Sequence, residues 1–193
     1  MPTSSIRIVI LSFSAIWIAA CAKTDVKNPE AKLNPSPKEG YEITLVVEDP
    51  PEPIEKITGT MQLDIENTDC MPLKDKIAGV KPDSSFGYPI EFKEKNGKFL
   101  GHVYADRLLN EDYYGLGKCI WNLTGAVVRI QFSKSEQIAV IYGDKIIKER
   151  SQESLCRRDV STSFACRIPV GDVSEDERKS RFLAVLTSRK IVI

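Results

Sequence analysis

Histidine and catalytic motifs are scarce in this chain of 193 residues. His102 is the single histidine, so a Ser-His-Asp hydrolase would have to use it, but no Gly-x-Ser-x-Gly turn is present to carry the nucleophile. Gly115-Leu116-Gly117-Lys118 lacks the glycine spacing of a phosphate-binding loop. We therefore predict that the chain is not an enzyme and that His102 is an ordinary strand residue on the polar or interfacial face.

An excess of charge of one sign is also missing. The chain has 27 Lys and Arg against 27 Asp and Glu. Such a balance gives no electrostatic attraction to a polyanion, so we expect no nucleic-acid partner. Cysteine pairs at metal-binding spacing, such as Cys-x-x-Cys, do not occur in the sequence. We therefore expect no metal and no cofactor.

Residues 1–20 have the three parts of a secretory signal peptide. Arg7 provides a positive charge, Ile8–Ile18 an apolar stretch, and Ala19 and Ala20 the small residues that a peptidase needs beside its cleavage site. The apolar stretch is shorter than the ~20 residues of a membrane-spanning helix. We expect residues 1–20 to be cleaved off before Cys21.

Ile18-Ala19-Ala20-Cys21 resembles the lipobox of bacterial lipoproteins. The resemblance implies that Cys21 is acylated with fatty acids such as palmitate and becomes the first residue of the mature chain. More than one acyl chain is needed for stable anchoring, and the modification in that family supplies several. Ala22 and Lys23 stand where inner-membrane members carry aspartate. The resemblance therefore implies a periplasmic protein anchored to the inner leaflet of the outer membrane.

The mature chain divides into a tether and one domain. Residues 21–40 carry Pro29, Pro35 and Pro37 among polar residues without apolar periodicity. This composition predicts a lipidated N-terminus followed by a flexible tether. Residues 41–193 are enough for a single β-rich domain with its own core.

Four further cysteines follow Cys21, namely Cys70, Cys119, Cys156 and Cys166. An even number in an oxidising compartment predicts two disulfides, although four cysteines allow three connectivities. We favour Cys70–Cys119 as a long-range link and Cys156–Cys166 as a local one, because a hairpin-like excursion separates the members of each pair.

Alternation of apolar and polar residues predicts β-strands through most of the domain. Asn96-Gly97 is typical of a type I′ turn and predicts a hairpin around it. The strand candidates are Tyr41–Val47, Ile57–Asn67, Ile90–Phe92, Phe99–Val103, Val128–Phe132, Ile138–Tyr142, Lys145–Glu149 and Ser161–Ile168.

One segment near the C-terminus has helical signals. Ser174 is typical of a helix N-cap, and Arg178–Leu186 has apolar residues at helical spacing. Phe182–Leu186 is equally compatible with a strand, as is the tail Arg189–Ile193. The predicted fold class is mainly β, an antiparallel β-sandwich or open barrel with one short C-terminal helix and two disulfides.

Acids, paired tyrosines and two glycines gather in Asp106–Trp121. Tyrosine rings offer rigid contact area, and carboxylates can meet cations on another protein. An alternative is that the aromatic residues, Trp121 included, cap the core while the glycines only shape the connection. The candidate partner-binding residues are Asp106, Glu111, Asp112, Tyr113 and Tyr114.

The lipobox, Pro50-Pro51, Asn67–Pro72 and Glu111–Trp121 together resemble small periplasmic lipoproteins encoded beside type VI secretion effectors, notably lipase effectors. The resemblance extends over Tyr41–Phe132. It implies a non-enzymatic immunity protein that binds a cognate secreted antibacterial toxin, such as a phospholipase or lipase, and neutralises it. Two alternatives stay open: a structural or assembly lipoprotein of the outer membrane, and a cell-wall glycosidase that uses adjacent acids.

Overall fold

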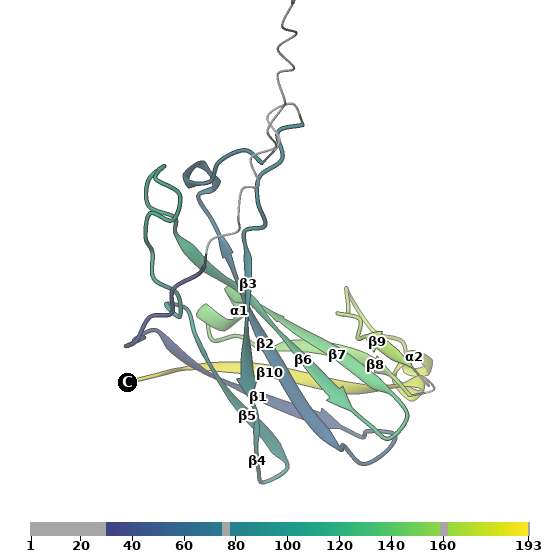
Figure 1. The fold of residues 1–193 in the computed structure, drawn as a ribbon. Coiled ribbons are helices and arrows are strands. Elements are labelled where there is room, and N and C mark those ends of the chain that lie inside the picture. The colour runs from purple at the N-terminus through teal and green to yellow at the C-terminus, as the bar shows by residue number, and fades with distance from the viewer. Residues whose placement is uncertain (1–29, 75–77, 159–161, 193) are drawn as a thin grey trace, which may run out of the picture.

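A computed structural model describes residues 30–74, 78–158 and 162–192. Within these residues, ten strands form two five-stranded sheets (Figure 1). The first sheet has the order β4-β5-β1-β10-β8, and the second has the order β3-β2-β6-β7-β9. The strands are β1 (Gly40–Glu48), β2 (Lys56–Ile65), β3 (Ser85–Glu91), β4 (Lys93–Lys95), β5 (Lys98–Tyr104), β6 (Trp121–Gln131), β7 (Glu136–Tyr142), β8 (Gln152–Arg157), β9 (Ser163–Ala165) and β10 (Arg181–Ile191).

The inward side chains of the central strands make the core. Ile43 and Leu45 on β1 and Leu63 on β2 are completely buried, and the residues between them along each strand are half-buried. This is the alternation that the sequence predicts. Burial of each such side chain stabilises the fold by ~1.5–3 kcal/mol before entropy is counted. The buried side chains of β1 and β10 in the first sheet and of β2 and β6 in the second sheet therefore form the centre of the core between the sheets.

Phe92 lies where the chain passes from the second sheet to the first. It stands between the end of β3 and the start of β4. Two glycines leave room for its ring, because a Cβ on Gly59 would lie 2.7 Å from Phe92 Cε2 and one on Gly101 would lie 3.0 Å from Phe92 Cε1. A larger residue at either place would displace the ring. This crossing closes one side of the sandwich.

The other side is closed by the chain around β8 and β9. β9 pairs in parallel with β7, and just beyond it Arg167 forms a bridge to Leu155 on β8, with N–O distances of 2.8 and 2.9 Å. The disulfide Cys156–Cys166 joins the same two segments. The predicted fold class is confirmed, and so is the favoured pairing of the cysteines, since Cys70 is bonded to Cys119.

The predicted hairpin is also confirmed. Asn96 and Gly97 have φ angles of 53° and 72° and connect β4 to β5. Both residues thus adopt the left-handed conformation that a type I′ turn requires.

One predicted strand is a helix in the structure, and the predicted C-terminal helix is present. Lys145–Glu149, predicted to be a strand, overlaps the short helix α1 (Gly143–Ile147), so the described chain has two short helices instead of one. The second, α2 (Glu175–Ser180), begins at the predicted N-cap, whose Ser174 hydroxyl accepts the Glu177 N–H at 3.3 Å.

The helical spacing over Arg178–Leu186 is mostly not realised. β10 begins at Arg181, directly after α2, and is bonded on both sides, to β1 and to β8. Phe182, Ala184 and Leu186 point into the core with strand periodicity. Two sets of strand hydrogen bonds and this burial outweigh a helical pattern that could bury only one face.

Candidate functional site

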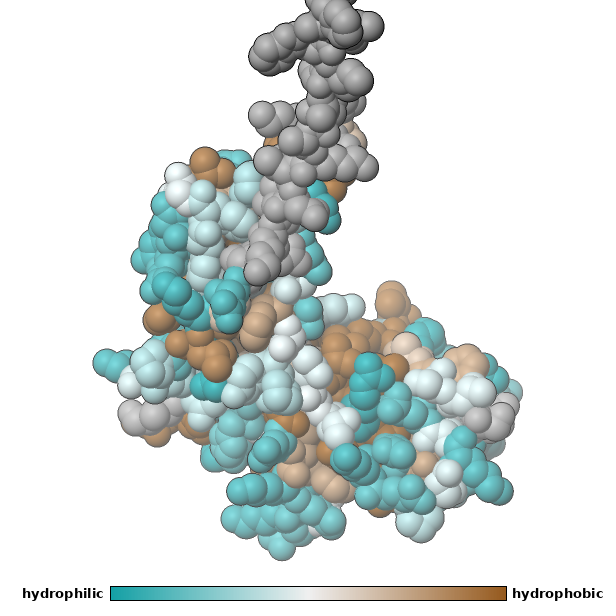
Figure 2. Space-filling view, in the orientation of Figure 1, coloured by the Kyte–Doolittle hydropathy of each residue, from teal (hydrophilic) through white to brown (hydrophobic). Residues whose placement is uncertain are grey.

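Three segments meet at one end of the sandwich and form a projection that we call the loop lobe. It consists of residues 32–39, 66–74 with 78–84, and 105–120. Figure 1 shows the two longer loops above the sheets, and Figure 2 shows them as a separate mass with apolar groups among hydrophilic ones. The disulfide Cys70–Cys119 links the two longer loops, and both its residues are buried.

Asn67 reinforces this link. Its side-chain amide donates to Lys118 O at 2.7 Å, and its carbonyl oxygen accepts the Ile120 N–H at 2.6 Å. The Glu66 N–H donates to Ile120 O at 2.9 Å. The two loops are thus fixed to each other by covalent and backbone-directed contacts.

Part of the segment expected to be a tether is bound to the loop lobe. Leu33 forms an antiparallel bridge with Leu108, supported by bonds from Asn34 N to Arg107 O at 2.8 Å and from Leu109 N to Lys32 O at 2.9 Å. The expected tether therefore differs from the structure over residues 32–39. The physical reason for this difference is that the backbone partners of the segment lie far away in the sequence, where local composition does not reveal them.

Asp106 uses its carboxylate to hold that segment. Its two oxygens accept the N–H groups of Lys38 at 2.7 Å and Glu39 at 3.0 Å. The Asn34 side chain donates to the Asp106 carbonyl at 2.9 Å. Asp106, predicted as a partner-binding residue, is thus engaged within the protein.

Glu111 is engaged as well, in an ion pair with Lys32 of 2.5 Å. The hydrogen bond and the charge of Glu111 raise the pKa of the Lys32 ammonium above its usual value of 10.5. Because both side chains are largely exposed, the pair contributes little to stability.

Asp112 organises the turn that follows it. Its Oδ1 accepts the N–H groups of Tyr114 at 3.2 Å, Gly115 at 2.6 Å and Leu116 at 3.1 Å. Partial burial raises the pKa of the Asp112 carboxyl, but these N–H groups and that of Gly117 outweigh it and hold the pKa below its usual range.

The two tyrosines lie against the core, as the alternative interpretation expects. Tyr113 meets Trp121 edge to face at 6.2 Å, and its hydroxyl donates to Leu109 O at 2.5 Å. Among the described residues the Tyr114 hydroxyl has no partner, and burial raises its pKa. The structure thus brings the predicted residues together, but mostly as internal supports.

Apolar residues of the loop lobe, which the sequence analysis did not select, are exposed instead. Five of the ten large hydrophobic residues exposed in the described chain belong to it, with 41–53% of their surface accessible. A hollow of about 570 Å³ is lined by Pro35, Pro37 and Tyr104, among others. The sequence held one signal of this exposure, because Leu116 stands between two glycines in a connecting loop. The five residues are Leu33, Leu73, Val80, Leu116 and Ile120.

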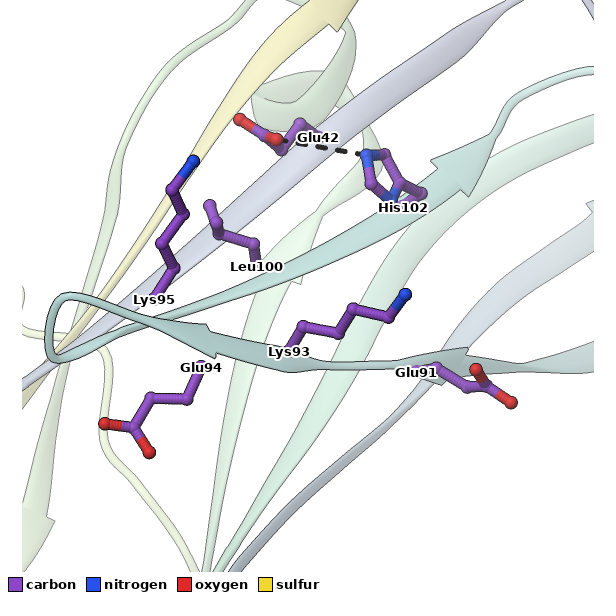
Figure 3. A pocket seen from close by; sticks show the side chains of 7 residues that line it. All are labelled: Glu42, Glu91, Lys93, Glu94, Lys95, Leu100 and His102. Carbon is purple, nitrogen blue, oxygen red and sulfur yellow. Dashed lines mark ion pairs between the residues drawn. The ribbon is translucent and has the colours of Figure 1, made fainter.

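A second hollow, of about 510 Å³, lies on the outer face of the first sheet (Figure 3). His102 on β5 and Glu42 on β1 face each other across it with 3.9 Å between His102 Nε2 and Glu42 Oε2. Glu42 also accepts from Arg189 at 3.2 Å, and Lys93 and Lys95 extend along the same hollow. His102 thus lies on the exposed polar face of a strand, in a hollow lined by three glutamates and two lysines.

Other kinds of site have less support in the structure. Across residues 30–74, 78–158 and 162–192, no group of three or more His, Cys, Asp and Glu side chains is placed to hold a metal ion. None of the helices in these ranges has the length and apolar character needed to cross a membrane. The predicted signal peptide and Cys21 lie outside the described residues. No family model, curated protein or solved structure matches this chain.

Proposed function

We propose that this protein is a membrane-anchored periplasmic immunity protein that binds and neutralises a cognate secreted antibacterial toxin of the phospholipase or lipase class. The supporting observation is the loop lobe, a surface fixed by a disulfide and internal hydrogen bonds that nevertheless exposes five large apolar side chains. A rigid surface loses little conformational entropy on binding, and this favours a tight inhibitor.

The contact with the toxin uses the apolar residues of the loop lobe. Leu116 and Ile120 flank the disulfide-bonded Cys119, and the hollow at Pro35, Pro37 and Tyr104 adjoins the bound N-terminal segment. A few side chains that are fully desolvated in well-packed pockets carry most of the binding energy of a protein interface. The acidic residues of the lobe keep this surface in shape, since their oxygens already accept internal donors.

A lipid anchor at Cys21 would suit this assignment. The chain toward Cys21 leaves the domain at the loop lobe, because residues 32–34 are bonded to residues 107–109. The backbone between Cys21 and Lys32 can span at most about 40 Å. An acylated Cys21 would hold the loop lobe within that distance of the membrane, where a phospholipase acts. Tethering also raises the effective concentration of an inhibitor at that surface.

The test is a pull-down with Ala22–Ile193, the expected mature chain without its acylated cysteine, from cells that express their secreted effectors, followed by mass spectrometry after washing at high salt. The expected result is a stoichiometric lipase or other hydrolase whose activity falls when the purified chain is added. Recovery of envelope assembly proteins alone would favour a structural lipoprotein of the outer membrane. Recovery of nothing from cells that contain the effectors would contradict the proposal.

Substitutions then locate the surface. Leu116→Glu should weaken toxin binding by at least tenfold, because it places a charge in a desolvated contact. Val170→Glu is the matched control, since Val170 is 90% exposed and lies outside the loop lobe. Equal losses from both variants would contradict a contact through the loop lobe.

A further inference from the structure

The hollow on the outer face of the first sheet is separate from the loop lobe, and we call it the sheet hollow (Figure 3). Its volume of about 510 Å³ lies within the ~300–1,000 Å³ of small-molecule sites. Leu100 on β5 gives it an apolar centre. The other described residues that line it are titratable, namely Glu42, Glu91, Lys93, Glu94, Lys95 and His102.

The strand order keeps opposite charges apart in the sheet hollow. Lys93 and Lys95 are two residues apart on the edge strand β4 and therefore lie on one face of it. Glu42 lies on β1, and β5 with Leu100 runs between β4 and β1. Because neighbouring strands are about 4.8 Å apart, the backbones that carry these lysines and this glutamate are separated by about 10 Å. Ammonium groups thus line one side of the hollow and a carboxylate lines the other.

The two ammonium groups are available to a ligand. Across the described residues neither Lys93 nor Lys95 has an ion-pair or hydrogen-bond partner, and both side chains are exposed. Two acids are close in the sequence, but Figure 3 shows the carboxylates of Glu91 and Glu94 directed away from Leu100. The same view shows the two lysine side chains on either side of Leu100. A molecule seated over Leu100 would therefore meet the lysines.

Glu42 keeps one carboxylate oxygen open. Its Oε1 accepts from Arg189 at 3.2 Å, across the β1–β10 pair, so Arg189 offsets part of its charge and fixes its orientation. Its Oε2 lies 3.9 Å from Nε2 of His102, its cross-strand partner on β5. That distance is too long for a hydrogen bond. Glu42 Oε2 can therefore accept a hydrogen bond from a molecule in the hollow.

We propose that the sheet hollow binds a short peptide with free termini, whose carboxylate meets Lys93 and Lys95 and whose ammonium donates to Glu42 Oε2. Three acids against two lysines and a histidine give a pure anion or a pure cation little net attraction, whereas separated charges favour a molecule that carries both. Because a stretched chain advances about 3.3–3.6 Å per residue, two or three residues match the separation of the charges and a single amino acid is too short. This site does not rest on the proposed immunity function.

The test is a titration of the folded chain Ala22–Ile193, with its disulfides intact, with dialanine and trialanine at constant ionic strength. Backbone amide shifts in NMR spectra report the binding, and we expect saturable shifts at Leu100 and His102. N-acetyl-dialanine lacks the ammonium and dialanine amide lacks the carboxylate, so each should bind about fivefold more weakly than dialanine. Free alanine should also bind more weakly. No saturable shift, or equal binding of the blocked peptides, would overturn the proposal.

Substitutions on the hairpin test the cationic side. Lys95 and Lys98 are direct cross-strand partners, and both are exposed, but Lys95 lines the hollow and Lys98 does not. Lys95→Gln and Lys93→Gln should each weaken dialanine binding about threefold, and Lys98→Gln is the matched control that should leave it unchanged. Equal weakening by Lys98→Gln would show a general charge effect and overturn the site. Unchanged binding in both Lys93→Gln and Lys95→Gln would do the same.

A substitution on β1 tests the acidic side. Glu42→Gln should reduce the affinity for dialanine to that of N-acetyl-dialanine, because both changes remove the same charge pair. Glu153→Gln is its control, since Glu153 is exposed on β8 of the same sheet and does not line the hollow. An unchanged preference for dialanine in Glu42→Gln, or an equal loss in Glu153→Gln, contradicts the assignment. If Glu42→Gln does not melt cooperatively, the lysine variants and the blocked peptides decide.

Discussion

The loop lobe and the region around α2, β8 and β9 each contain one disulfide, yet their carboxylates have different partners. In the loop lobe the carboxylates of Asp106 and Asp112 accept backbone N–H groups, and exposed apolar residues are left to face solvent. Around α2, β8 and β9 acids instead pair with arginine side chains, as Glu177 does with Arg167 and Arg181. The comparison teaches that a conspicuous acidic sequence can serve the fold by fixing the backbone of a loop, whereas scattered acids and arginines can join separate elements.

The largest expected difference comes from removing each disulfide separately. Cys70 and Cys119 are 49 residues apart, whereas Cys156 and Cys166 are 10 apart. Loop-closure entropy predicts a loss of about 4 kcal/mol for the first pair and about 3 kcal/mol for the second. Urea unfolding of the two double Cys→Ser variants measures this. A larger loss for the second pair would mean that the region around α2, β8 and β9 is the more tightly constrained one.

Asn67→Ala should have the next largest effect. It removes two hydrogen bonds, and since each contributes ~0.5–1.5 kcal/mol, the expected loss of stability is about 1–3 kcal/mol. Chemical denaturation gives the value. Asn122→Ala, on the exposed face of β6, is the control and should change stability little. Equal effects would show that Asn67 does not bind the two loops together.

The turn at Asp112 should respond to acid. The folded-state pKa of Asp112 lies below the ordinary 3.8, so its stabilising effect is complete above about pH 4. That effect is lost as the pH falls through the folded-state value. The protection of the Gly115 and Leu116 amides, measured as their exchange relative to the intrinsic rate at the same pH, should therefore fall in strong acid. Asp112→Asn keeps a carbonyl acceptor and should remove the pH dependence; its persistence would assign the effect to another group.

Lys32→Ala should have the smallest effect. The Lys32–Glu111 pair is exposed, so the thermal midpoint near neutral pH should stay almost unchanged. The folded-state pKa of Lys32 lies above 10.5, so the small contribution of the pair is present below that pH and is lost as the pH rises through the folded value. Thermal melts at pH 7 and in strong alkali measure both. A large loss at neutral pH would mean that the bound N-terminal segment depends on this contact.

Local patterns were enough to predict much of the fold. The alternation of apolar and polar residues predicted the central strands, and Asn96-Gly97 predicted the hairpin. The number and spacing of the cysteines favoured the observed disulfides. Each of these features depends on neighbours in the sequence or on chain connectivity. β10 escaped a firm assignment because its spacing fits a helix and a strand, and pairing with β1 and β8 decides between them.

The sites were harder to predict. Asp106 finds its partners 67 and 68 residues away, and Glu42 meets His102 and Arg189 only through strand register. The sequence indicates which groups are present but not which of them the fold leaves available. The exposure of Leu116 and Ile120 is likewise a result of tertiary packing.

The closed sides of the sandwich bear on how the protein behaves at high local concentration. A free strand edge is a template for pairing with another chain and leads to aggregation. Here β4 is three residues long and carries exposed Lys93 and Lys95, while β3 contains Pro89, which cannot donate to a neighbour. The Arg167 bridge covers part of β8. Copies of this protein crowded onto one surface would thus find few edges on which to polymerise.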